Sequence, residues 1–218
     1  MPEASHERPA PRPAARLALA VVPAVTAAVA VGSALRTNAW TAWGVWPMES
    51  KIDSGTSFAD LANITATAQC ISRGWDYTTC DPYGRLFQPY VVLPARVLSA
   101  LGVDMSATPA LGLALACCYV VGVAVLGIAV ARHWRGSLAG LGVAAVVLAL
   151  ASIAPPSMLA VERGQVELLT FALVCIGLVL LPARRGWLRV VGAVAAVAAV
   201  VTKFVAVGAL APVVQRRR

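Results

Sequence analysis

Long stretches without a single charged residue constrain this chain more than any other feature. Charge is absent from Leu17 to Leu35, from Ala107 to Ala131 and from Gly136 to Val161. A membrane-spanning helix needs about 20 consecutive apolar residues. These runs are continuous and rich in Ala, Leu and Val, whereas the strands of a membrane barrel alternate apolar and polar residues. The sequence therefore predicts an all-α fold, a polytopic bundle of transmembrane helices.

Five apolar segments are candidates for membrane spans. Apolar residues make up 59% of the chain, which is too high for an ordinary soluble domain. The predicted spans lie near residues 17–35, 107–131, 137–159, 168–183 and 190–214.

The last of these segments is ambiguous because it contains Lys203. One span would leave the terminal arginines 216–218 outside the cell, against the usual distribution of positive charge. Two short half-spans that meet near Lys203 would return them to the cytoplasm, and such broken helices usually line a cavity. In a tilted single span, the Lys203 ammonium would instead extend to the membrane surface.

The positive charge of the chain predicts its orientation rather than a nucleic-acid partner. The formal net charge is +8, but the arginines cluster before the first span, between the second and third, and between the fourth and fifth. Short basic connections of this kind face the cytoplasm. We therefore expect a multi-pass cell-membrane protein with a cytoplasmic N-terminus. Residues 1–16 are predicted to be a disordered cytoplasmic tail. The arginines concerned are Arg8, Arg12, Arg16, Arg132, Arg135, Arg184, Arg185 and Arg189.

The region between the first and second spans, residues 36–106, is unusually polar. Six of the ten carboxylates of the chain lie in it, together with many of its aromatic residues. The charge pattern places this region outside the cytoplasm as a long loop. A membrane protein that concentrates acids and aromatics in one loop is expected to use that loop for chemistry or recognition.

Within this loop, Ser57 to Arg73 has the pattern of an amphipathic helix. Apolar residues recur at three- and four-residue spacing from Phe58 to Ile71. Ser57 is a plausible N-cap, and Gly74 stands where a helix commonly ends. Asp60 then lies in the first turn, where unpaired backbone N–H groups favour a carboxylate. Helix capping alone would explain Asp60.

The second half of the loop contains turns and a possible disulfide. Asp81-Pro82-Tyr83-Gly84 fits a type I turn, which by itself would explain Asp81. Cys70 and Cys80 would be able to form a disulfide in the oxidising environment outside the cell. No CxxC motif or histidine cluster indicates a metal site.

The loop ends in an apolar stretch, Leu86 to Val103, that does not resemble a complete span. Pro89, Pro94 and Arg96 interrupt it. We interpret it as a re-entrant or interfacial element.

The connection between the third and fourth spans reads Glu162-Arg163-Gly164-Gln165-Val166-Glu167. The order of the spans places it outside the cytoplasm, close to the membrane. Charged residues at this depth are costly and are therefore candidates for function. A simpler explanation for Arg163 is an ion pair with Glu162 or Glu167.

Taken in order, four motifs resemble a known enzyme class. They are Asp60-Leu61 at a helix start, Gly74 to Arg85, Glu162 to Gln165, and the Ala-rich segment from Gly192 to Lys203. The chain resembles the polyprenyl-phosphate-sugar-dependent membrane glycosyltransferases of the GT-C type, most closely the actinobacterial mannosyltransferase-like family 87 (DUF2029). The family usually has Arg-Gly-Asn where this chain has Arg163-Gly164-Gln165. Its members usually continue through further spans, so the resemblance implies the N-terminal part of such an enzyme.

The resemblance also implies roles for individual residues. Asp60 matches the aspartate that acts as general base on the acceptor hydroxyl. Three cations are candidates to bind the phosphate of the donor: Arg163, Lys203 and Arg85. Residues of the substrate-binding loops would be Asp76, Tyr77, Asp81, Tyr90 and Gln165.

The implied reaction transfers a sugar, mannose by analogy, from a polyprenyl-phosphate donor to an envelope glycan or glycolipid. It inverts the anomeric centre and needs no cofactor, and the partners are membrane lipids, the lipid-linked donor and the acceptor. Two other interpretations are open. The chain could be a non-catalytic multi-spanning envelope protein or assembly partner, or a small transporter, although no internal repeat supports transport.

Overall fold

The computed structural model describes residues 13–37, 58–75, 89–134 and 136–202. All regular secondary structure in these residues is helical, in agreement with the predicted fold class. The elements are α1 (Pro13–Thr37), α2 (Ala59–Ser72), α3 (Pro89–Ala100), the 3-10 helix η2 (Met105–Ala107), α4 (Thr108–His133), α5 (Leu138–Ser152), α6 (Pro155–Arg163), α7 (Glu167–Leu180) and α8 (Gly186–Thr202).

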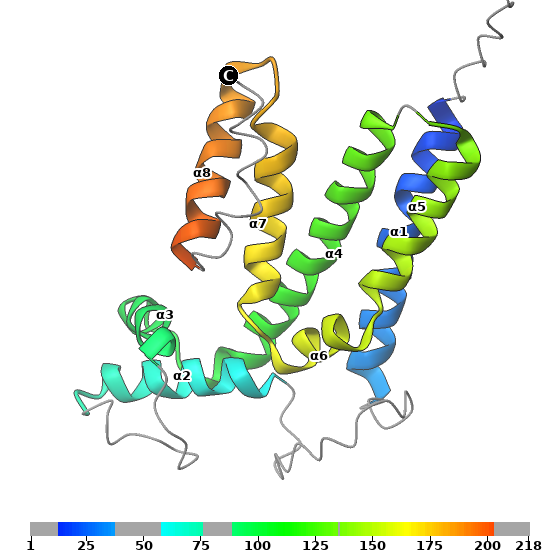
Figure 1. The fold of residues 1–218 in the computed structure, drawn as a ribbon. Helices are drawn as coiled ribbons and strands as arrows, with labels where there is room; N and C mark the ends of the chain where they lie inside the picture. The colour runs from blue at the N-terminus through cyan, green and yellow to red at the C-terminus, as the bar shows by residue number, and fades with distance from the viewer. Residues whose placement is uncertain (1–12, 38–57, 76–88, 135, 203–218) are drawn as a thin grey trace, which may run out of the picture.

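Long helices form the body of the molecule, and short helices lie across one end of it (Figure 1). The long helices α1, α4, α5, α7 and α8 alternate in direction along the chain. The start of α1 and the α4–α5 and α7–α8 connections therefore share one end. Helices α2 and α6 lie at the opposite end, roughly across the bundle (Figure 1).

Two helices are long and apolar enough to cross a membrane, within Pro13–Ser33 and Met105–His133. Helices α5 and α6 would provide a third crossing if the bent pair is one span. Helices α7 and α8 are apolar but shorter than a typical span within the described residues. These lengths indicate a membrane protein. Helix α8 includes residues 190–202 of the ambiguous last segment, whereas residues 203–214, Lys203 among them, lie outside the described residues.

Prolines set where several helices begin and bend. Helix α1 starts at Pro13 rather than Leu17, because proline is tolerated in a first turn, where its missing N–H has no intrahelical partner. The predicted span at 137–159 is broken between α5 and α6, with a bend of 45°. Pro155 and Pro156 cannot donate the backbone hydrogen bonds that would continue α5, so the chain turns there and α6 begins.

Helix α2 ends as predicted and is enclosed on more than one side. Gly74 has the left-handed conformation (φ 71°) that follows many helix ends. The predicted apolar face is buried at Leu61, Ile64 and Ala68, and Ile64 and Ala68 pack against Ala95 of α3. Thr65 on another side is also buried, where its hydroxyl hydrogen-bonds the Thr108 hydroxyl of α4 at 2.7 Å.

The long helices approach closely wherever small residues face a neighbour. A β-carbon on Gly127 of α4 would lie 2.5 Å from the backbone oxygen of Ala20 in α1. A β-carbon on Gly192 of α8 would lie 2.7 Å from the backbone nitrogen of Leu181, just after α7. Such contacts suit packing in a membrane, because helices gain van der Waals contact when their backbones approach closely.

The central cluster of buried side chains joins α1, α4, α6 and α7. Tyr119 lies within it and donates its hydroxyl hydrogen to the Ser152 carbonyl at 2.6 Å, which connects α4 to the end of α5. The buried members are Ala27, Val31, Ala116, Tyr119, Val123, Met158, Val161 and Leu168.

Two glycine substitutions test this packing, with opposite expected signs. Gly127→Ala should destabilise the protein by about 1–3 kcal/mol, because the new methyl group forces α1 and α4 apart. Gly142→Ala in α5 meets no atom within 4 Å and should stabilise by up to about 1 kcal/mol through helix propensity. Thermal unfolding in detergent measures both. Equal effects of the two substitutions would contradict the close contact of α1 and α4.

Candidate functional site

The start of α2 is positioned by a contact with the connection between α6 and α7. The residue before the helix is Phe58, whose N–H donates to the Glu162 carbonyl oxygen at 2.8 Å. The N-cap is therefore Phe58 rather than the predicted Ser57, and Asp60 is the second helical residue rather than the third. Phe58 has φ 68°, a conformation that is uncommon for a bulky residue. A tertiary contact thus overrides the capping pattern of the sequence.

Phe58 is 4% exposed and fills the space left by two glycines. A β-carbon on Gly112 of α4 would lie 2.2 Å from the Phe58 ring. A β-carbon on Gly164 would lie 2.9 Å from the Phe58 β-carbon. The first turn of α2 is therefore held against both α4 and the α6–α7 turn.

Gly164 also ends α6 and directs the chain toward α2. It has φ 63°, and its N–H donates to the Val161 oxygen at 3.1 Å. The next N–H, of Gln165, donates to the Ala160 oxygen at 3.0 Å. This pair of hydrogen bonds is the Schellman arrangement that stops a helix on a left-handed glycine. It places Arg163 and Gln165 on either side of the turn that contacts α2.

Asp60 accepts hydrogen bonds from both of these side chains. Arg163 Nε donates to Asp60 Oδ2 at 2.9 Å, and Arg163 Nη2 donates to Oδ1 at 2.6 Å. Gln165 Nε2 donates to Oδ2 at 3.1 Å. The Arg163 contact is bidentate, the geometry in which arginine binds a carboxylate most strongly.

The two oxygens of the carboxylate are not equivalent. Oδ2 accepts two hydrogen bonds, whereas Oδ1 accepts one. A carboxylate oxygen has two accepting directions. The Asp60 side chain is 29% exposed, and one accepting direction of Oδ1 is not filled by a described residue.

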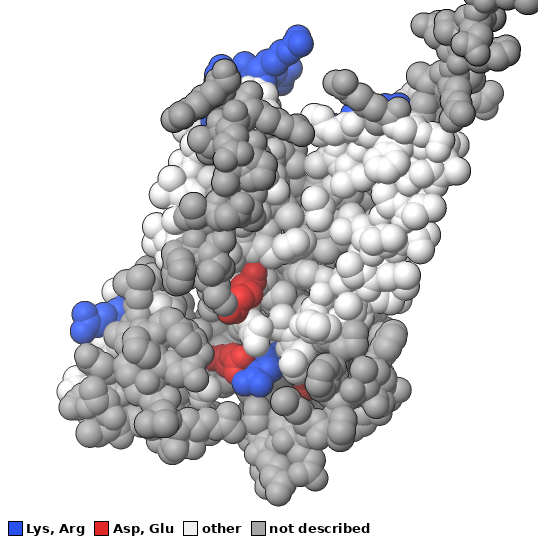
Figure 2. All heavy atoms as spheres, in the orientation of Figure 1, with Lys and Arg blue, Asp and Glu red and all other residues white. Residues whose placement is uncertain are grey.

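Charge is distributed unequally between the two ends of the bundle. Figure 2 shows acidic side chains near the end that carries α2 and α6, with basic side chains beside them and at the margin of that end, whereas the opposite end shows basic side chains without acidic ones. The other described acids belong to the same end as Asp60: Asp104, Glu162 and Glu167. Hydrogen bonds from the Ser106 side chain and backbone lower the pKa of Asp104, which caps η2.

The structure brings together three of the residues predicted to form the site: Asp60, Arg163 and Gln165. Proximity in sequence suggested Glu162 or Glu167 as the partner of Arg163. The structure instead supplies Asp60, which precedes Arg163 by 103 residues.

The described structure does not show the other predicted residues as members of this group. Cys70 is disulfide-bonded. Tyr90 falls in α3, but its side chain is not described. The remaining positions lie outside the described residues: Arg85, Lys203, Asp76, Tyr77, Asp81 and Cys80.

The sequence does not mark Phe58 or Gly112 as parts of the site. Its pattern places Phe58 only on an apolar helix face, and Gly112 lies in an uncharged run. No local pattern marks a glycine whose purpose is to admit a distant aromatic ring.

Among the described residues, no group of three or more His, Cys, Asp or Glu side chains is arranged to hold a metal ion.

No family model, curated protein or solved structure matches this chain. Its function must therefore be inferred from its own residues.

A double-mutant cycle tests the contact between Asp60 and Arg163. Asp60→Asn and Arg163→Gln should each destabilise the protein, and the double variant should lose less than the sum. We expect a coupling of about 1–3 kcal/mol, because each single substitution removes the bidentate contact while the other, partly buried charge stays in place. Thermal unfolding in detergent measures it. Strict additivity would show that the two side chains do not interact.

The same cycle tests whether Phe58 positions Asp60. In a Phe58→Leu background the coupling energy between Asp60 and Arg163 should fall below about half of its wild-type value. The reason is that the first turn of α2 loses the packing of Phe58 against Gly112 and Gly164. A Phe171→Leu background is the matched control, since Phe171 packs against Tyr119 and is not part of the contact between Phe58 and the two glycines. Coupling that survives unchanged in Phe58→Leu would remove Phe58 from this role.

Proposed function

We propose that this chain is a membrane glycosyltransferase, or part of one, that transfers a sugar from a polyprenyl-phosphate donor to an envelope lipid or glycan. The sugar favoured by the resemblance is mannose. The observation that carries the proposal is the convergence of Asp60, Arg163 and Gln165. The resemblance implies each of them as a site residue, and they come from two distant segments.

The position of the group supports this function. It lies at the end of the bundle opposite the basic connections, which on the usual rule face the cytoplasm. Asp60 and Arg163 would then be at the outer membrane surface. A lipid-linked donor and an envelope acceptor meet at such a surface.

The chemistry assigns separate tasks to the two side chains. The acceptor hydroxyl donates its hydrogen bond to Asp60 Oδ1, the oxygen with an accepting direction to spare. As the hydroxyl oxygen attacks the anomeric carbon, its proton passes to Asp60. The bond between the anomeric carbon and the phosphate oxygen breaks, the configuration inverts, and the polyprenyl phosphate leaves as an anion.

Arg163 couples the two halves of this step. Before reaction its guanidinium is bound to the Asp60 carboxylate. Protonation removes the negative charge of Asp60 as negative charge develops on the leaving phosphate. Both changes favour movement of the guanidinium toward phosphate, which arginine binds with the same bidentate geometry. Lys203 and Arg85 are the other proposed phosphate-binding cations.

One observation favours the alternative of a non-catalytic envelope protein. The three hydrogen bonds on Asp60 all come from the protein itself, so the group would also serve as a clamp between α2 and the α6–α7 turn. A clamp affects stability but transfers no sugar.

Asp60→Asn distinguishes a general base in sugar transfer from a purely structural contact. As a general base, Asp60 contributes about 10²- to 10⁴-fold to the rate, so sugar transfer from a labelled polyprenyl-phosphate donor should fall by that factor. Membranes from cells that express the protein provide the assay. The matched control is Asp104→Asn, which alters an acid at the same end that caps η2, and this variant should retain wild-type transfer.

Wild-type transfer by Asp60→Asn would reject the general-base role. No transfer by the wild-type protein from any polyprenyl-phosphate sugar would reject the proposed function and favour the clamp.

A further inference from the structure

A group of arginines surrounds the connection between α7 and α8, at the end of the molecule opposite Asp60. Arg184 and Arg185 lie in the connection, and Arg189 lies in the first turns of α8. All three are exposed. None forms an ion pair or side-chain hydrogen bond with another described residue.

The described carboxylates cannot neutralise these arginines. Asp60 lies in α2, Glu162 at the end of α6, and Glu167 at the start of α7, all at the other end of the bundle. The fourth, Asp104, precedes η2, which contacts α2. The arginine group is therefore suited to an anion from outside the protein.

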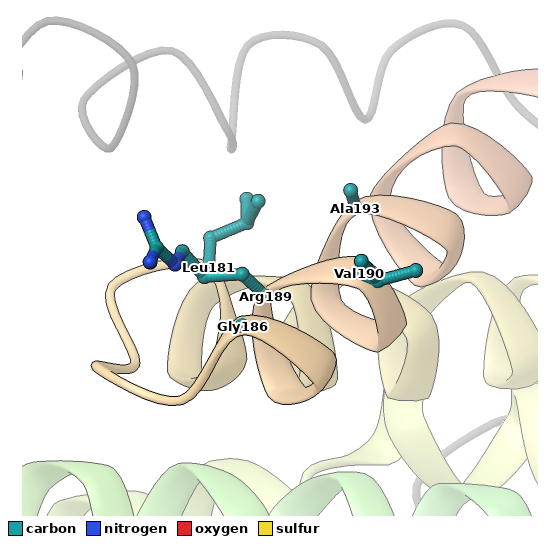
Figure 3. Close-up of a pocket in the computed structure, with 5 residues that line it drawn as sticks. All are labelled: Leu181, Gly186, Arg189, Val190 and Ala193. Carbon is teal, nitrogen blue, oxygen red and sulfur yellow. The ribbon is translucent and has the colours of Figure 1, made fainter.

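A groove of about 390 Å³ opens beside these arginines. Its walls are apolar apart from Arg189, whose side chain extends past Leu181 (Figure 3). The lining residues are Leu181, Gly186, Arg189, Val190 and Ala193.

The groove continues into an exposed apolar stripe along α8. Val190 belongs to both, and Val194, Val197 and Val201 follow at helical spacing, each more than 60% exposed. Trp187 is 62% exposed beside the groove, and tryptophan prefers the level of the lipid headgroups. An anionic head above a long apolar surface matches the shape of a phospholipid rather than that of a free anion.

We propose that this groove binds an anionic membrane phospholipid. The lipid phosphate lies against the guanidinium of Arg189, with Arg184 and Arg185 nearby, and an acyl chain lies along the valine stripe of α8. Basic pockets on the cytoplasmic side of membrane helices bind anionic headgroups in this way. The site does not depend on the proposed glycosyltransferase activity.

Native mass spectrometry of the detergent-purified protein tests the site. Phosphatidylglycerol is titrated as the anionic probe and phosphatidylcholine as the zwitterionic one. We expect tighter binding of phosphatidylglycerol, weakened about fivefold by Arg189→Gln. Arg132→Gln is the matched control, because Arg132 is an exposed arginine at the same end that does not line the groove. This variant should change the affinity less than twofold.

A second variant tests the groove without altering charge. Ala193 is exposed and lines the groove, so Ala193→Phe should fill it and reduce phosphatidylglycerol binding while the fold is retained. If Arg189→Gln does not fold, Ala193→Phe still tests whether the groove binds the lipid.

Four results would overturn the proposal. Three of them are equal binding of the two lipids, equal losses in Arg189→Gln and Arg132→Gln, and unchanged binding in Ala193→Phe. Inorganic phosphate is the final control. Full displacement of the lipid by millimolar phosphate would indicate a free-anion site and also reject the phospholipid.

Discussion

The arrangement around Asp60 depends on one packing contact, the placement of Phe58 against two glycines. Gly112 leaves room for its ring on α4, and Gly164 leaves room for its β-carbon at the α6–α7 turn. The backbone hydrogen bond from Phe58 to Glu162 then aligns two segments that are far apart in sequence. With the first turn of α2 held in this way, the Asp60 carboxylate meets Arg163 in a bidentate contact. Any larger side chain at either glycine would move α2 away.

Close helix packing gives the bundle two chemically different ends. Helices of alternating direction bring the basic connections together at one end and the described acids at the other. Small residues such as Gly127 allow the backbones to touch, so the separation of the ends is set by rigid helices. The proposed transfer chemistry uses the acidic end, and the proposed phospholipid site uses the basic end. The two proposals are therefore independent in space and in their tests.

Much of the architecture could be predicted from local patterns. Uncharged runs indicated the long apolar helices and Gly74 marked the end of α2, whereas the span predicted at 137–159 is broken at Pro155-Pro156. The helix starts were less accurate, because the N-cap at Phe58 is determined by the Glu162 carbonyl and not by Ser57. The partner of Arg163 was sought among neighbouring acids. The ion pair joins residues 103 positions apart because the helices pack together, and spacing in the sequence does not predict that packing.

The sequence by itself determined that this is a chain of apolar helices with basic connections, and its motifs, through their resemblance to a family of membrane glycosyltransferases, imply Asp60, Arg163 and Gln165 as site residues. The first conclusion follows from hydrophobicity and charge, which are properties of individual residues and short runs. Only the tertiary structure decided that these three side chains form one group and that Phe58 positions it. The reason is physical: a bidentate ion pair requires atoms within about 3 Å of each other. That distance is set by how α2, α4 and the α6–α7 turn pack together.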